Sequence, residues 1–127
     1  MKRILVAEDS PRIRETITRY LREAGFDTLV ATTGLEALRI VRDERPDVIL
    51  LDGLLPQLHG FELARLVRAV DPGYHPAIVL VSGIYTNHSD RADACRRYGI
   101  THFVSKPFTR EQLLEAVDQA ARQIRAA

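Results

Sequence analysis

Five short apolar runs, separated by longer stretches with a helical pattern, limit the possible folds of this chain more than any other feature. Each run has four or five residues and is apolar on both faces, which is typical of strands buried on both sides of a parallel sheet. The runs cover residues 4–7, 28–31, 48–51, 77–81 and 102–105. This alternation predicts an α/β fold, the doubly wound (βα)5 sandwich, with helices on both faces of a five-stranded parallel sheet.

The stretches between the runs contain recognisable helix ends. Ser10 is suited to cap a first helix and Thr33 to cap a second. Thr109, with a glutamine three residues later, has the spacing of a capping box and predicts the start of the last helix. Two further helices are expected over about residues 60–70 and 89–99.

Length and composition narrow the class of protein. The chain has 127 residues, which predicts a single domain over residues 1–127 with one sizeable core. Its net charge of +1 gives no reason to expect direct binding to nucleic acid or to an anionic membrane, and no apolar run is long enough to cross a bilayer. One cysteine, Cys95, excludes an internal disulfide framework and fits a reducing, cytoplasmic location.

Polar residues follow four of the five predicted strands. Glu8 and Asp9 come after the first, Asp52 after the third, Ser82 after the fourth and Lys106 after the fifth. Ligands of open parallel sheets bind beyond the carboxyl ends of the strands, so we expect these side chains to converge. Three carboxylates repel one another unless cations lie among them. Lys106 and Mg²⁺, a hard ion that prefers oxygen ligands, would meet that need.

A carboxylate, a hard metal ion, a hydroxyl and an amine together favour phosphoryl chemistry. The Asp52 carboxylate is the candidate nucleophile and would form an acyl phosphate. The metal, Ser82 and Lys106 would neutralise charge on the transferring oxygens. A nucleotide-binding or flavin-binding protein of the same fold is disfavoured, because no glycine-rich phosphate loop follows the first run.

Taken in order along the chain, these motifs resemble the receiver domain of two-component response regulators. The matching segments are ILVAEDS at 4–10, VILLD at 48–52, Leu55 with Pro56 and Gly60, VLVSG at 79–83 and VSKPF at 104–108. The resemblance covers essentially the whole chain. It implies the flavodoxin-like, chemotaxis-regulator-like fold with strand order 2-1-3-4-5.

The resemblance also implies a role for each residue of the site. Asp52 would be the phosphoacceptor, and Lys106 would pair with the phosphoryl group. Glu8, Asp9 and Asp52 would bind Mg²⁺ together with the backbone carbonyl of Leu54.

Three further residues have roles that the resemblance implies. Ser82 would supply the hydroxyl that contacts the phosphoryl group and would act as a switch residue. Phe103 stands at the aromatic switch position, and because phenylalanine donates no hydrogen bond, its readout must be steric. The bond between Lys106 and Pro107 is expected to be cis, an isomer that only X–Pro bonds adopt at low cost.

The implied function is a phosphorylation-dependent switch of a two-component system. A histidine kinase or phosphotransfer protein would donate the phosphoryl group from phosphohistidine. The domain would catalyse this transfer and a slow self-dephosphorylation, without being a conventional enzyme. The surface of the fourth helix, fifth strand and fifth helix would then bind a downstream protein or fused effector, or form a homodimer. The alternative is a pseudo-receiver that binds its partners constitutively.

Two departures from the family pattern lead to further expectations. Leu54 and Ile84 lie two positions after Asp52 and Ser82, and the resemblance implies that their side chains flank the phosphoryl group. Apolar side chains cannot orient an attacking water there, so the phosphoryl group should persist. The loop 84–89, which contains Tyr85 and His88, is longer than is usual and is expected to form a distinctive partner surface.

Overall fold

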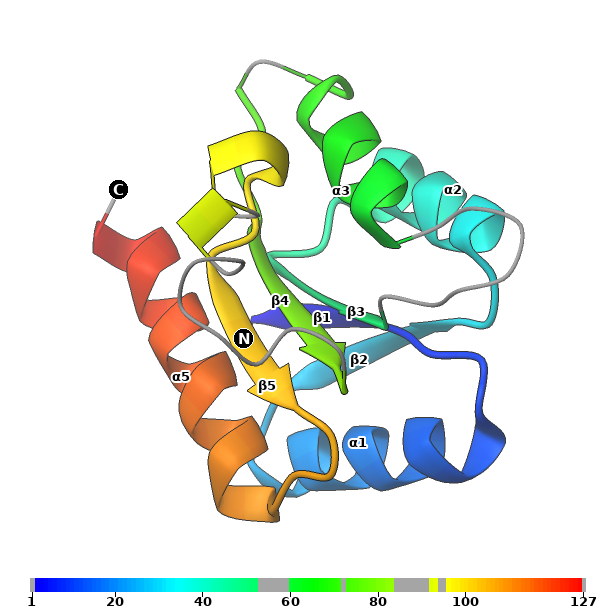
Figure 1. Cartoon of the computed structure of the whole chain (residues 1–127), viewed down its shortest axis with the longest axis vertical. Coiled ribbons are helices and arrows are strands. Elements are labelled where there is room, and N and C mark those ends of the chain that lie inside the picture. The colour runs from blue at the N-terminus through cyan, green and yellow to red at the C-terminus, as the bar shows by residue number, and fades with distance from the viewer. Residues whose placement is uncertain (1, 53–59, 72, 84–91, 94–95, 127) are drawn as a thin grey trace.

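A central sheet of five parallel strands organises the structure, a computed structural model that describes residues 2–52, 60–71, 73–83, 92–93 and 96–126. The strands are β1 (Arg3–Ala7), β2 (Asp27–Ala31), β3 (Val48–Asp52), β4 (Ala77–Ser82) and β5 (His102–Ser105). All neighbouring pairs are parallel, and the strand order is β2-β1-β3-β4-β5 (Figure 1). The predicted fold class and strand order are therefore confirmed.

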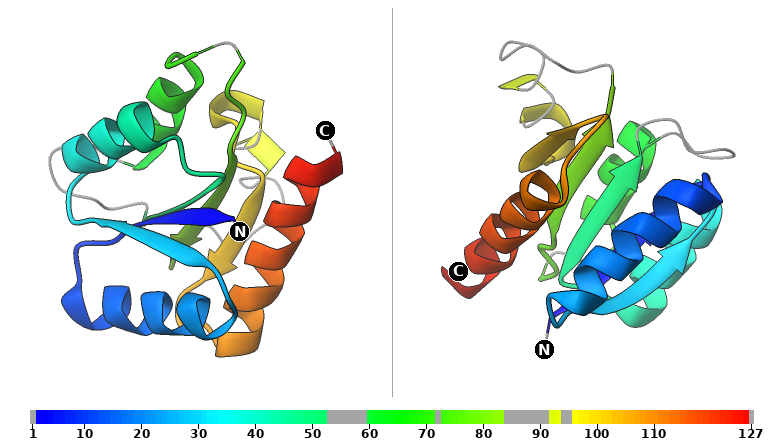
Figure 2. Two further views of the ribbon diagram at one scale, coloured as in Figure 1. Left: turned by 180° about the vertical axis from the view of Figure 1, so that it is seen from behind. Right: turned by 90° about the horizontal axis from the view of Figure 1, so that it is seen from below.

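Helices cover both faces of this sheet. They are α1 (Pro11–Glu23), α2 (Gly34–Glu44), α3 (Gly60–Arg68) and α5 (Arg110–Ala126), and residues 92–93 and 96–98 are also helical, where the fourth helix is expected. Helices α1 and α5 lie on one face, and α2 and α3 lie on the other (Figures 1 and 2). This is the predicted doubly wound sandwich.

The helices begin where the sequence predicts, because their caps are local. The hydroxyl of Ser10 accepts a hydrogen bond from the backbone N–H of Ile13, and that of Thr33 accepts one from the backbone N–H three residues later. Thr109 and Gln112 form a reciprocal capping box with distances of 2.9 and 3.1 Å.

Helix α3 ends at Arg68, two residues earlier than the expected end at residue 70. The N–H groups of Ala69 and Val70 bond the carbonyls of Leu66 and Val67, three residues back instead of four. Such bonds tighten the last turn and satisfy carbonyl groups that the end of a helix leaves free. The α-helix therefore gives way to a tighter turn before β4.

The sheet divides the core into two apolar clusters, because successive side chains of a strand point to opposite faces. Strands β3 and β4 are buried at every position. The cluster under α1 and α5 includes Ile4, Val6, Ile17, Leu21, Leu50, Val79, Val104 and Val117. The cluster under α2 and α3 includes Leu5, Val41, Ile49, Leu51, Leu63, Val67 and Leu80.

A group of four residues, which we call the amino-edge clamp, joins the turns that precede β3 and β4. Arg45 ends α2 in the left-handed conformation, with φ of 47°, and forms an ion pair with Asp71 at 2.6 Å. Its guanidinium carbon lies 5.7 Å from the centre of the Tyr74 ring. The Tyr74 hydroxyl donates a hydrogen bond of 2.6 Å to the Pro46 carbonyl. The clamp thus fastens two neighbouring strands where they begin.

Candidate functional site

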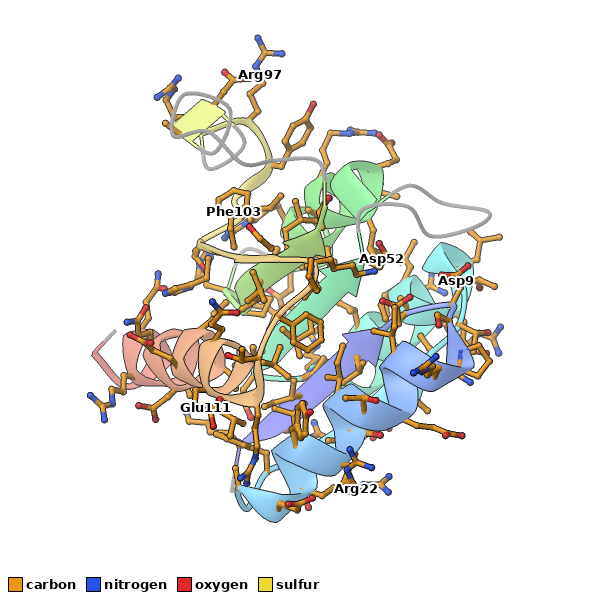
Figure 3. The ribbon with its side chains drawn as sticks, turned by 60° about the horizontal axis from the view of Figure 1, so that its bottom comes forward. Asp9, Arg22, Asp52, Arg97, Phe103 and Glu111 are labelled. Carbon is orange, nitrogen blue, oxygen red and sulfur yellow. The ribbon has the colours of Figure 1, made fainter. Side chains whose placement is uncertain are left out.

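The carboxyl ends of the strands bring the predicted site residues to one edge of the sheet. In the strand register, Ala7 pairs with Leu51, Asp52 pairs with Val81, and the last residues of β4 and β5 pair with each other. Asp52 and Ser82 end their strands, Glu8 and Lys106 directly follow theirs, and Asp9 is one residue further along. Asp9 and Asp52 accordingly lie at this edge (Figure 3).

Lys106 lies between two of the acids. Its Nζ atom is 3.0 Å from Oε1 of Glu8 and 3.5 Å from Oδ2 of Asp52. Glu8 is only 2% exposed and Asp52 only 8%, whereas the Lys106 side chain is 25% exposed. Buried carboxylates are rare without a partner. The ammonium group of Lys106 supplies that partner to both.

The three predicted metal ligands form one oxygen cluster. Glu8, Asp9 and Asp52 each offer a carboxylate oxygen, and these oxygens lie within 4.8 Å of one another. Glu8 is held on its second oxygen as well, because Oε2 accepts a hydrogen bond of 3.1 Å from the backbone N–H of Ser10. Asp9 is exposed. A cluster of oxygen donors with an open side suits a hard divalent cation.

Burial and charge shift the proton affinities of the central pair. Burial raises the pKa of the Glu8 carboxyl, and the adjacent charge of Asp52 adds to this effect against the opposing bonds from Ser10 and Lys106. Burial disfavours the charged form of Lys106, but its bond to Glu8 and the charges of Glu8 and Asp52 prevail and raise its pKa. The amine therefore remains a cation at neutral pH.

Three other predicted residues lie in the described part of the chain, namely Ser82, Phe103 and Pro107. Ser82 is 7% exposed, and its carbonyl accepts a hydrogen bond of 3.0 Å from the backbone N–H of Lys106. The peptide bond between Lys106 and Pro107 is cis, as the resemblance implies. Phe103 is half-buried and packs against the cluster under α2 and α3, whereas its neighbour Val104 belongs to the opposite cluster. Leu54, Ile84 and the loop 84–89 with Tyr85 and His88 lie outside the described residues.

Arg14 also contacts the site, although the sequence pattern alone does not predict this. Its Nη1 atom donates to the backbone carbonyls of Glu8 and Asp9, at 3.0 and 3.4 Å. The signal available in the sequence was an arginine within one turn of the cap of α1, from where a long side chain reaches back to the preceding loop.

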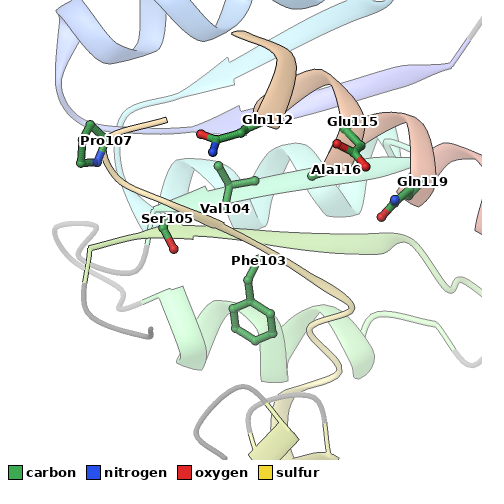
Figure 4. Close-up of a pocket in the computed structure, with 8 residues that line it drawn as sticks. All are labelled: Phe103, Val104, Ser105, Pro107, Gln112, Glu115, Ala116 and Gln119. Atoms are coloured by element: carbon green, nitrogen blue, oxygen red, sulfur yellow. The ribbon is translucent and has the colours of Figure 1, made fainter. Parts of the chain in front are cut away.

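A hollow of about 320 Å³ lies between β5 and α5, beside the site. Phe103 and Ser105 of β5 line it together with Gln112, Glu115 and Gln119 of α5 (Figure 4). It occupies part of the surface that the sequence reading assigns to partner binding.

None of the helices that the structure describes has the length and apolar character required to cross a membrane.

Comparisons with known proteins agree with the fold and show the family of the chain. The family model of the response regulator receiver domain matches residues 4–118. The DNA-binding response regulator MtrA of Mycolicibacterium smegmatis is 38% identical over 96% of this chain and 51% of its own length. The chain thus spans about half the length of the MtrA proteins that it matches. Sporulation initiation phosphotransferase F of Bacillus subtilis is 32% identical over 91% of this chain and 90% of its own.

A solved structure with a bound metal ion shares the fold. The receiver domain of the sensor histidine kinase PA1611 from Pseudomonas aeruginosa superposes with a TM-score of 0.83. It is 29% identical, with 95% of this chain and 98% of that chain covered, and it contains a magnesium ion coordinated in its active-site cleft. The match to the family, the shared fold and the cluster of acids with a lysine lead to one conclusion: this chain belongs to the response regulator receiver domains of two-component systems.

Proposed function

We propose that residues 1–127 form a single receiver domain that accepts a phosphoryl group on Asp52 and signals through a changed surface. The observation that carries the proposal is the position of the Lys106 amine, 3.0 Å from Glu8 and 3.5 Å from Asp52, beside the acid cluster. A phosphoryl group on Asp52 would bring further negative oxygens to this place, where a cation already lies.

In the proposed transfer, a carboxylate oxygen of Asp52 attacks the phosphorus atom of a phosphohistidine. A P–O bond forms as the P–N bond breaks, and the electron pair of the P–N bond returns to the imidazole ring. The product is an acyl phosphate on Asp52 and a free histidine on the donor protein. Lys106 and Ser82 would contact the phosphoryl oxygens. The donor would be a histidine kinase or a phosphotransfer protein.

The acid cluster fits Mg²⁺ by the chemistry of its donors. Asp9 and Asp52 would be the direct protein ligands, because both oxygens of Glu8 are already engaged, one by Lys106 and one by Ser10. Glu8 would support the site from behind, and the backbone carbonyl of Leu54 would add a ligand. When bound, the ion would offset the negative charge of the acids and of the phosphoryl oxygens.

The surface of β5 and α5 is the proposed binding surface for downstream partners. Phe103 and Val104 face opposite layers of the core, so a movement of Phe103 alters the α2 and α3 side and also the wall of the hollow between β5 and α5. We infer that this surface, together with the fourth helix, binds a downstream protein or fused effector, or forms a homodimer. We propose that this domain makes no direct contact with nucleic acid, since its net charge is only +1. We also propose a cytoplasmic location, which the single cysteine fits.

One experiment tests the chemistry. The purified protein is mixed with acetyl phosphate and Mg²⁺ and analysed by intact mass spectrometry. The expected result is a gain of one phosphoryl group, which Asp52→Asn abolishes and which a chelator of divalent ions suppresses. Asp43→Asn is the matched control, because Asp43 is an exposed acid on α2 away from the site. Absence of any adduct on the unaltered protein would overturn the proposal and leave the pseudo-receiver, a constitutive interaction module.

A further inference from the structure

We propose that Arg14 is a positioning residue that fixes the turn between β1 and α1 and so holds Asp9 where it can share a cation with Asp52, with Glu8 supporting the site from behind. The inference rests on the proposed function and deepens it by naming a residue outside the acid cluster on which metal binding depends.

The contacts of Arg14 run from the helix back to the loop. Its backbone N–H bonds the carbonyl of Ser10 at 2.9 Å, which anchors its main chain in the first turn of α1. Its Nη1 atom then donates to the carbonyl of Glu8 at 3.0 Å and to that of Asp9 at 3.4 Å. The side chain is half-buried. A guanidinium is suited to this task because its donors are rigid and remain charged.

The turn needs such an anchor. β1 ends at Ala7 and α1 begins at Pro11, so residues 8–10 belong to neither element. The sheet holds the N–H of Glu8, which bonds the Ala31 carbonyl at 3.1 Å, but Asp9 lies one residue further out and is exposed. With its carbonyl bonded by Arg14, the main chain of Asp9 is fixed relative to α1. Its carboxylate then stays within reach of the cluster.

Charge and position predict opposite effects on metal binding. Arg14 is a cation near the acids, and on electrostatic grounds alone its removal would strengthen the binding of another cation. If the residue positions the turn, its removal weakens binding, because the ligand must be ordered at the moment the ion binds. Residues that orient metal ligands from outside the coordination sphere typically change affinity by about tenfold or more. The sign of the change therefore separates the two roles.

The experiment compares Arg14→Gln, Arg14→Lys and the control Arg12→Gln. Arg12 lies on the same helix, is exposed, and has no recorded side-chain hydrogen bond or ion pair within the described part of the chain. Calorimetric titration with Mg²⁺ of the metal-free proteins gives the affinity, and thermal unfolding without Mg²⁺ gives the stability. We expect Arg14→Gln to bind Mg²⁺ about tenfold more weakly than Arg12→Gln. Arg14→Lys, which keeps one charged donor, should fall between them.

A second measurement separates a loss of ligand positioning from a general loss of the ability to be phosphorylated. The Mg²⁺ concentration that gives half of the maximal phosphorylation rate should rise in Arg14→Gln, while the rate at saturating Mg²⁺ recovers. Binding by Arg14→Gln as tight as, or tighter than, that of Arg12→Gln would overturn the inference. If Arg14→Gln does not fold, Arg14→Lys is compared with Arg12→Lys. Binding of Mg²⁺ by Arg14→Lys as tight as, or tighter than, that of Arg12→Lys would then overturn the inference. Failure of the unaltered protein to bind Mg²⁺ or to accept phosphate would refute the proposed function itself, which is a distinguishable result.

Discussion

Lys106 and Glu8, which are 98 positions apart in the chain, meet at the centre of the site with 3.0 Å between Nζ and Oε1. The same amine is 3.5 Å from Asp52, the proposed phosphoacceptor. The amine of Lys106 therefore lies closer to Glu8 than to the proposed phosphoacceptor Asp52. The backbone N–H of Ser10 holds Glu8, and Glu8 in turn holds the ammonium group of Lys106 beside Asp52. The charge that would meet the proposed phosphoryl group is therefore already in place.

Replacement of Lys106 by methionine should destabilise the metal-free protein, because it leaves Glu8 buried without its charged partner. A hydrogen bond to a charged, buried group is worth about 2 kcal/mol. Urea unfolding without Mg²⁺ measures the loss, and Lys2→Met provides a matched removal of the other lysine in the chain. Equal stability of the two variants would contradict the prediction. When Glu8→Gln is already present, Lys106→Met should lower the free energy of unfolding by less than it does in the wild type.

Replacement of Asp9 by asparagine should change stability and metal affinity in opposite directions. Its oxygen lies within 4.8 Å of those of Glu8 and Asp52, so removal of its charge relieves repulsion. We expect the metal-free protein to gain up to about 1 kcal/mol of stability, since Asp9 is exposed and screened. Calorimetry should show Mg²⁺ binding at least about tenfold weaker. A variant that loses stability and retains its Mg²⁺ affinity would exclude Asp9 as a ligand.

The contribution of Tyr74 to stability should disappear in alkaline solution. Burial raises the pKa of the Tyr74 hydroxyl, with the nearby charge of Asp47 adding to the effect. The unfolded chain ionises this tyrosine near pH 10, whereas the folded protein keeps it protonated. Its contribution is thus complete below about pH 10 and is lost as the pH rises toward the folded pKa.

Denaturation of the wild type and of Tyr74→Phe between about pH 8 and about pH 11 measures this effect. The stability difference should be about 1 kcal/mol at the lower pH and should shrink at the higher. Tyr20→Phe, which removes the hydroxyl of a ring that lies 5.6 Å from the guanidinium carbon of Arg19 and 5.9 Å from that of Arg110, is the control for the loss of a tyrosine hydroxyl. A constant difference for Tyr74→Phe would refute the prediction.

The phosphorylated domain should lose its phosphoryl group slowly, because the side chains of Leu54 and Ile84 have no polar atom that could orient an attacking water. Leu54→Asn supplies such an atom and should shorten the lifetime of the phosphoryl group. Release of inorganic phosphate after removal of the donor measures that lifetime, and Leu54→Met, which stays apolar, is the control. A lifetime that is the same in all three proteins would show that water reaches the group by another route.

Much of the fold could be predicted because its signals are local. A capping hydroxyl acts within three residues, as at Ser10, Thr33 and Thr109, and a buried strand shows itself in four or five consecutive residues. The common edge of the site also followed, because parallel strands place their carboxyl ends together. Strand order did not follow from the pattern and came from the family resemblance.

The details of the site depend on the spacing between elements, which the sequence pattern does not contain. The ion pair of Lys106 with Glu8 is possible only once β5 and β1 lie in one sheet with two strands between them. The contact of Arg14 with the Glu8 and Asp9 carbonyls depends on the angle at which α1 leaves the loop. Early termination of α3 likewise reflects a tight turn that the apolar spacing up to Val70 does not reveal.

The amino-edge clamp of Arg45, Pro46, Asp71 and Tyr74 lies at the opposite end of the strands from the acids and the lysine. The residues of the clamp, which join the starts of β3 and β4, are thus distinct from those of the proposed phosphoryl site. Variation in the clamp would then change the stability of the domain without replacing any residue of the proposed site. An evolving lineage, or a protein engineer, would thus find in the clamp a way to adjust robustness that leaves the residues of the proposed site in place.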